Sequence, residues 1–297
     1  MHNLSHKFTL FRIQLHKSRQ LQLLANSYPE AEILKQALYE KPSDLVRGHQ
    51  WRIGNVEDLS DDAMVFFIGK EQPTRFGTVG ADGDFHEAEA LVAPNTLVVV
   101  DLNFQLLAIA HRIELSQSVY AVASRIRTLL ASTTVVVDAG CTVSVEAIND
   151  PTDFIQVLES AAAVVKFKVA YGLPNVWDVD RDFQRPIQDT AKVLGAYEGE
   201  ATFKGDDLHR GPLVRLARAS SAIGKRAVAW VQKIAGERVV AVRQENNPVI
   251  LEQQVVEDDA ESPAEDIAVL EQSQPLRIGD LIVRRMREEY VRIRQYE

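Results

Sequence analysis

The residues with the most informative chemistry are cationic, and they stand close together in the second half of the chain. Between positions 204 and 243 there are nine Lys or Arg residues: Lys204, Arg210, Arg215, Arg218, Lys225, Arg226, Lys233, Arg238 and Arg243. The same stretch holds only three acidic residues, Asp206, Asp207 and Glu237. The chain of 297 residues has a formal net charge of -9, so this segment reverses the average. Such a local reversal favours a binding surface for an anionic partner.

Helical spacing sorts this segment into two faces. From about Pro212, at about 100° per residue, one side of a predicted helix is mainly apolar and carries Leu213, Leu216, Ser220, Ile223, Ala227 and Trp230. The other side carries Arg215, Arg218 and Lys225, with Arg210 and Arg226 near its ends. We therefore expect an outward basic stripe.

Three lysines on neighbouring predicted strands extend this surface. Lys166 and Lys168 alternate with Val165, Phe167 and Val169, and Lys204 follows Phe203. If the apolar residues pack on the helices, Lys166, Lys168 and Lys204 line the open face of a sheet that carries no aromatic pair. Two alternatives remain: a plainly solvated charged surface, or a docking surface for an acidic protein segment.

Two acidic groups have the residue types of a metal site. Asp178, Asp180 and Asp182 stand at alternate positions, which on an extended segment place three carboxylates on one face. The start of a helix is the alternative reading, since carboxylates there accept free N–H groups. The other group is Asp82 and Asp84, followed by His86, Glu87 and Glu89, and a hairpin turn explains its aspartates. We predict no cofactor, because phosphate-binding and dinucleotide-binding loops are missing from the sequence.

Candidates for nucleophilic or stacking chemistry are few. Cys141, the only cysteine, stands in a strand pattern and reads as a small buried residue. His209 precedes the basic helix, where a cap explains it. Tyr171 and Trp177 bracket a turn; they either pack in a core or stack on a base beside the lysines.

The elements that position these residues fall into two predicted domains. Residues 1–132 show mainly strand patterns separated by turn clusters, with covering helices, and predict an antiparallel β domain. Residues 133–251 contain the pattern strand, acidic cap, helix, strand twice, with an extra helix between the two units at about 180–196. This predicts an α+β fold in which the second domain is ferredoxin-like, a split βαβ arrangement with an inserted helix.

Two further segments complete the chain. Residues 252–275 are rich in carboxylates and predict an acidic linker. Residues 276–297 predict a basic amphipathic helix with Ile282, Met286, Tyr290 and Ile293 along one stripe and Arg284, Arg285 and Arg287 elsewhere. These three arginines are a predicted second basic patch.

The leading hypothesis is a non-catalytic protein that binds DNA or RNA phosphates without sequence specificity. A cytoplasmic location is expected, because only one cysteine and no membrane-spanning run occur. We also expect the protein to be one component of a multi-protein bacterial system, such as phage defence, which suits a chain that is poor in catalytic sites. The alternative is an oligomeric assembly or regulatory subunit whose basic helix docks on an acidic protein surface. A third reading is a metal-dependent enzyme that uses Asp178, Asp180 and Asp182.

Overall fold

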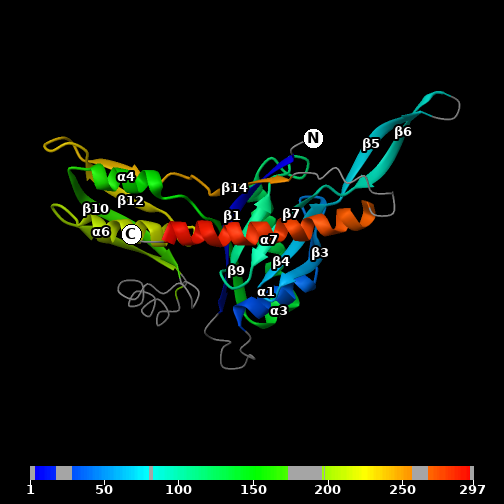
Figure 1. The fold of residues 1–297 in the computed structure, drawn as a ribbon, viewed down its shortest axis with the longest axis horizontal. Coiled ribbons are helices and arrows are strands. Elements are labelled where there is room, and N and C mark those ends of the chain that lie inside the picture. The colour runs from blue at the N-terminus through cyan, green and yellow to red at the C-terminus, as the bar shows by residue number, and fades with distance from the viewer. Residues whose placement is uncertain are drawn as a thin grey trace.

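The computed structural model describes residues 4–17, 29–79, 83–172, 196, 198–255 and 267–294 (Figure 1). Over these ranges the chain is a mixed α+β protein with six helices, and its strand pairs are antiparallel. The α+β class predicted from the sequence is confirmed. Two larger sheets, one of eight strands and one of four, account for most of the strands.

The eight-stranded sheet forms the centre of the molecule. Its strands follow the order β14-β1-β8-β7-β4-β3-β2, and β9 also pairs with β1. Their bounds are β1 (Leu4–Lys17), β2 (Ser43–Val46), β3 (His49–Ser60), β4 (Ala63–Lys70), β7 (Asn95–Asp101), β8 (Leu106–Ala110), β9 (Cys141–Ala147) and β14 (Ile250–Val255).

Helices cover both faces of this sheet. Phe11 and Ile13 of β1 pack in a core with α1 (Glu30–Tyr39), α2 (Val119–Ala131) and α3 (Thr134–Asp138). Phe8 and Leu10 point to the opposite face, into a core closed by α7 (Ile267–Arg294). Because both faces are buried, the central strands are apolar runs rather than alternating ones, as β4 shows.

One edge of β1 is shared by two strands that are distant in the sequence. The Leu10 amide donates to the Val249 carbonyl, and the Ile148 amide donates to the Leu10 carbonyl, both at 3.0 Å. Thus β9 and β14 lie end to end along β1, and the chain between them leaves the first sheet and returns to it. The sequence pattern placed the domain boundary near residue 132 and β9 in the second domain; the structure pairs β9 with β1 instead.

The described elements between residues 150 and 247 surround a sheet of their own, and we call them the second domain. Its elements are α4 (Thr152–Ser160), β10 (Ala163–Gly172), β11 (Glu198–Lys204), α6 (Arg210–Ala222), β12 (Ala227–Gln232) and β13 (Val240–Arg243). The sheet order is β11-β10-β12-β13, so among the described elements a helix followed by two paired strands occurs twice. The ferredoxin-like arrangement is not confirmed, because the strand before α4 lies in the first sheet. The predicted inserted helix falls largely outside the described residues.

Two local predictions differ from the structure. The run Thr133 to Val137, whose β-branched residues favour a strand at the start of the predicted second domain, lies mainly in α3. The predicted basic helix stops earlier than expected, because Gly224 adopts a φ of +74° just after α6. Residues 227–232 are therefore strand β12, and Trp230 lies in a sheet rather than on a helix.

Regular elements extend into both ends of the range predicted to be a linker. Strand β14 continues to Val255, and α7 starts at Ile267 and contains Pro275. Most of the predicted acidic linker, residues 256–266, lies outside the described residues. The predicted apolar stripe of α7 is confirmed, since Ile282, Met286, Tyr290 and Ile293 are all buried.

A hairpin projects from the first domain. Strands β5 (Gln72–Val79) and β6 (Phe85–Val92) form a separate two-stranded sheet that extends away from the body in Figure 1, and we call it the arm. The hairpin predicted from the alternating runs here is confirmed.

Candidate nucleic-acid interface

The four-stranded sheet has one face turned toward helices and one turned away from them. Phe167 and Val169 of β10 pack with residues of α4 and α6 in a third core. Successive side chains on a strand point to opposite faces, so Lys166 and Lys168 point away from these helices. We call this side the open face; from the strand register it includes Lys166, Lys168, Ala170, Glu200, Thr202, Lys204, Val228, Trp230, Ala241 and Arg243, so it carries a carboxylate among its cations.

The register sets these side chains in rows across the sheet. Lys166 is paired with Lys204 on β11 and with Trp230 on β12. In the next row, Lys168 lies beside Val228, which is paired with Arg243. The predicted lysine-lined sheet face therefore exists, and it also carries an aromatic ring and an arginine.

Lys166 and Trp230 are in direct contact. The Lys166 Nζ lies 3.9 Å from the centroid of the Trp230 ring, which is a close cation–π geometry. Lys204 and Arg243 are exposed, and neither has an ion pair among the described residues. Lys168 instead pairs with Glu200 at 2.6 Å. The open face thus presents cations around an indole, which suits phosphates flanking a stacked base.

The arginines of α6 do not join the open face. Helix α6 packs on the opposite side of the sheet, so the predicted continuity between arginine stripe and lysines is wrong. Arg210 is structural: it forms a bidentate ion pair with Asp207 and donates to the carbonyls of Ala161 and Ala162. The Arg210 guanidinium lowers the pKa of Asp207.

Arg218 and Arg215 differ in environment. Arg218 donates to the Ile293 carbonyl of α7 at 3.5 Å, so it helps to join the two helices. Arg215 is exposed and has no ion pair among the described residues, as expected for an outward helix position.

Lys225 and Arg226 lie at the junction of the two domains, after the end of α6. Lys225 pairs with Glu198 at 2.9 Å and lies 3.9 Å from Glu146 of β9. The Lys225 ammonium lowers the pKa of Glu198. Arg226 donates to the side chain of Asn246 at 2.9 Å.

The three arginines of the predicted second patch on α7 have different roles, and two of them make structural contacts. Arg287 pairs with Asp62 at 2.8 Å and with Asp101, so it fastens α7 to the first sheet. Arg285 donates to the Glu252 carbonyl of β14. Arg284 is exposed without an ion pair in the described part of the chain. We therefore remove Arg287 and Arg285 from the set of binding candidates.

The other sequence candidates assemble no catalytic group. Asp178, Asp180, Asp182 and Trp177 lie outside the described residues, and so does Asp82. In the described ranges no three His, Cys, Asp or Glu side chains come together as metal ligands, and Glu89 of the arm pairs with Arg75. Cys141 is half-buried, with its Sγ 3.7 Å from the Ala139 carbonyl. No side-chain capping bond from His209 to α6 is formed.

Sequence reasoning missed Trp230 and did not include Arg243. A sequence signal for Trp230 was Gly224 itself, a residue type that commonly follows the end of a helix, whereas the alternating burial of Ala227 to Gln232 is known only from the structure. Tyr171, the aromatic that was proposed instead, is on β10, but its side chain lies outside what the structure describes.

No protein-family model matches the chain, and a search of the curated proteins finds no match. Among the described residues, none of the helices combines the length and the apolar character needed to cross a bilayer.

Proposed function

We propose that the protein binds single-stranded nucleic acid on the open face of its second domain, without chemical conversion of the strand. The observation that carries this proposal is the row formed by Lys204, Lys166 and Trp230, with Arg243 in the neighbouring row. Cations and a half-buried indole on the same face are the two components that non-specific single-strand binding needs.

The balance of forces favours a local contact. The chain as a whole carries a charge of -9 and repels nucleic acid, so binding depends on the few cations that are free to meet phosphates. Lys204 and Arg243 have no acidic partner among the described residues, and Lys166 rests on the indole. A base that stacks on Trp230 displaces the Lys166 ammonium toward a phosphate, so the cation–π contact is exchanged for a charge pair.

The preference for single strands follows from this stacking. An indole on a sheet surface reaches the π-face of a base only when that base is not stacked in a duplex. We infer no sequence readout, because stacking and phosphate contacts are tolerant of base identity. The proposal also includes a location in a reducing cytoplasm, which is consistent with a single cysteine. It includes a role in a multi-protein bacterial system as well.

Fluorescence anisotropy with labelled single-stranded DNA, single-stranded RNA and duplex DNA tests the proposal. The double variant Lys166→Glu/Lys204→Glu is expected to weaken single-strand binding by at least about tenfold at low salt. The matched double variant Arg215→Glu/Arg284→Glu changes the net charge equally but leaves the open face intact, and it is expected to bind nearly as wild type. Equal losses in both variants would show that the open face is not the site.

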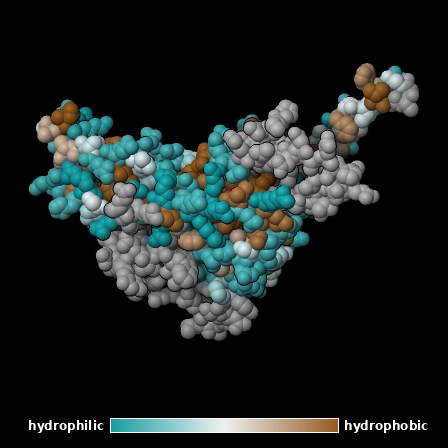
Figure 2. All heavy atoms as spheres, in the orientation of Figure 1, coloured by the Kyte–Doolittle hydropathy of each residue, from teal (hydrophilic) through white to brown (hydrophobic). Residues whose placement is uncertain are grey.

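A second candidate function, an assembly subunit, is favoured by the arm. Val79 and Phe85 pair across the arm and form an exposed apolar cluster, and Phe85 is 87% exposed (Figure 2). Leu91 is exposed on the same face, and Phe76 and Val92 are exposed on the opposite face. An isolated two-stranded hairpin is marginally stable in water, and an exposed apolar cluster on such a hairpin is typical of a surface that a partner covers. The arm lies far from the open face, so the two functions are compatible.

A further inference from the structure

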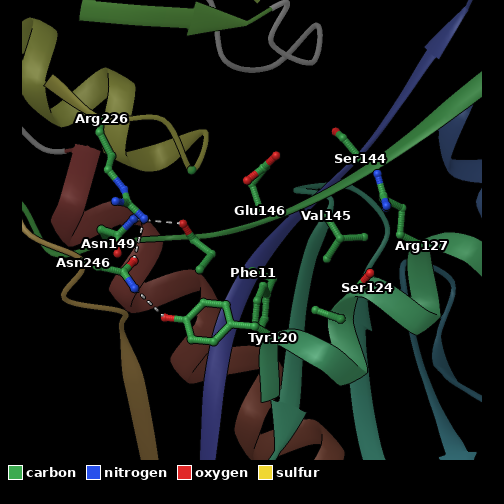
Figure 3. Close-up of a pocket in the computed structure, with 13 residues that line it drawn as sticks. Phe11, Tyr120, Ser124, Arg127, Ser144, Val145, Glu146, Asn149, Arg226 and Asn246 are labelled. Atoms are coloured by element: carbon green, nitrogen blue, oxygen red, sulfur yellow. Dashed lines mark hydrogen bonds between the residues drawn. The ribbon is translucent and has the colours of Figure 1, made fainter. Parts of the chain in front are cut away.

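A cavity of about 300 Å³ lies where the second domain meets the edge of the first sheet (Figure 3). Its walls come from α2, from β1 and β9, from the turn between α6 and β12, and from the segments that enter and leave the second domain. The polar side chains among its lining residues are Tyr120, Ser124, Arg127, Ser144, Glu146, Asn149, Arg226 and Asn246. A volume of this size is at the lower end for small-molecule sites.

The cavity is held open by a fixed junction. Gly224 packs so closely on β9 that an added Cβ would clash with the Cβ of Glu146. Immediately after it, Lys225 reaches Glu146 and Glu198. Because these contacts fix the second domain against β9, the space beside them is a preformed part of the fold.

One buried acceptor at this cavity lacks a partner. Asn149 is 1% exposed, and its Nδ2 donates to the Ala147 carbonyl at 3.2 Å. Its Oδ1 has no hydrogen-bond donor among the described residues. Burying an amide oxygen without a donor is unfavourable. The oxygen itself is closed off from solvent, so a bound group supplies the missing N–H or O–H only when the Asn149 side chain turns toward the cavity that it lines.

Around this acceptor lies a chain of polar groups suited to a heterocyclic base. Arg226 donates to Asn246 at 2.9 Å, and the Asn246 amide donates to the Tyr120 hydroxyl at 3.3 Å. The Tyr120 ring packs edge to face on Phe11, with the centroids 5.9 Å apart. This side of the cavity offers donors, acceptors and an aromatic ring together.

The other side of the cavity suits a phosphate. Arg127 and Ser124 stand one turn apart on α2, and Ser144 of β9 lies on the same side of the view in Figure 3. Arg127 is exposed and has no ion pair in the described part of the chain. Arginine with hydroxyl groups is a combination that recognises phosphate oxygens.

The charges at the cavity favour an anion. Two arginines, Arg127 and Arg226, face one carboxylate, Glu146, which already lies near Lys225. We propose that the cavity binds the nucleoside monophosphate unit of a nucleotide, with the phosphate at Arg127 and the base at Asn149 and Asn246. The unit is supplied either by a free nucleotide or by the phosphorylated end of a strand.

The position of Arg226 relates the cavity to the open face. Arg226 directly precedes β12 and is four residues from Trp230, which corresponds to about 13 Å along a strand. A single-stranded nucleic acid bound along the open face therefore reaches the cavity within a few nucleotides. Binding of a free nucleotide does not depend on the proposed function, so failure of one does not imply failure of the other.

Isothermal titration calorimetry of the full chain with AMP, GMP, CMP and UMP, and separately with inorganic phosphate and the nucleosides, tests the assignment. We expect at least one mononucleotide to bind at a single site, at least about tenfold more tightly than phosphate or the matching nucleoside. Arg127→Glu and Asn149→Ala are each expected to weaken that binding by about tenfold or more. Arg215→Glu is the matched control and is expected to change nothing.

Three results would overturn the assignment: no mononucleotide binding by the wild type, affinity equal to that of inorganic phosphate, or full binding by Arg127→Glu. Since Asn149 is buried, Arg127→Glu on the surface of α2 keeps the test valid if Asn149→Ala fails to fold. A pair of oligonucleotides with and without a 5′-phosphate identifies the source. If the phosphorylated oligonucleotide binds more tightly and Arg127→Glu abolishes this difference, the bound unit is the end of a nucleic-acid strand. If mononucleotides bind but the two oligonucleotides bind equally, the bound unit is a free nucleotide.

Discussion

The ammonium of Lys166 lies 3.9 Å above the ring of Trp230, on the face of the second sheet that points away from α4 and α6. If a nucleic-acid base replaces this contact, Trp230→Ala should weaken single-strand binding by roughly 1–3 kcal/mol, which is about fivefold to more than a hundredfold. Trp230→Phe retains a stacking surface and should lose much less. Anisotropy at one salt concentration measures both, and equal losses for Ala and Phe would argue against stacking.

Arg287 is a structural residue in our account, although its sequence context predicted a phosphate contact. It pairs with Asp101, whose side chain is 0% exposed, and removing it leaves that carboxylate buried without its cation. We expect Arg287→Met to lower the free energy of unfolding by about 3 kcal/mol, the low end for a broken buried pair, because Arg287 is partly exposed.

Urea unfolding at neutral pH measures this loss. Arg284→Met, on the exposed side of the same helix, is the matched control and should stay within about 0.5 kcal/mol of wild type. An Arg287→Met protein with wild-type stability would mean that α7 does not depend on this pair.

The stability of the protein should depend on pH through His16 and His111, whose environments lower their pKa values. Burial lowers the pKa of His16 below its ordinary value of 6.5, and Lys225 lowers it further; burial and then Lys7 do the same for His111. Near pH 6.5 the unfolded chain binds protons that the folded chain does not bind. The contribution of the two neutral histidines to the free energy of unfolding is therefore fully present above about pH 6.5. It declines as the pH falls toward their lowered pKa values.

Urea unfolding between pH 7.5 and 5, in steps, checks this dependence. His16→Gln removes one of the two titrating groups, so the variant should show a shallower loss of stability over the same range. An unchanged slope in the variant would mean that His16 binds its proton over the same pH range in the folded and unfolded chains.

The arm should cause self-association or partner binding if it acts in assembly. Phe85→Asp puts a charge into the exposed apolar cluster of the arm and is expected to abolish any concentration-dependent oligomer seen by sedimentation velocity. Ile234→Asp, at another exposed apolar position, is the control and should leave the oligomer intact. A wild-type chain that remains a monomer at every concentration would exclude self-assembly through the arm.

The spacing of apolar residues in the sequence predicted which side chains of a helix or strand are buried. The stripe of α7 and the alternation of Lys166 and Lys168 followed from the periods of 3.6 and 2, and both are confirmed. The end of α6 was missed, since a basic and apolar pattern continued past Gly224 at helical spacing. A glycine at positive φ, which the pattern does not reveal, ended the helix there.

Relations between distant residues could not be predicted in this way. Strand β9 fits a second domain by its order in the chain, yet its pairing with β1 joins residues more than 120 positions apart. The same holds for the ion pair between Arg287 and Asp101. Whether an arginine is free for a ligand or is bound to a carboxylate depends on such tertiary contacts, so the list of basic candidates was longer than the set that the fold leaves available.

The salt dependence of single-strand binding tests the central claim most directly. Each phosphate contact to a single strand contributes about 0.7 to the slope of log Kd against log salt concentration. Lys166→Gln/Lys204→Gln should therefore reduce the slope by about 1.4, from two contacts at about 0.7 each, whereas Arg215→Gln/Arg284→Gln should leave it unchanged. A wild-type slope in the open-face variant, or the same reduction in both variants, would contradict binding at the open face.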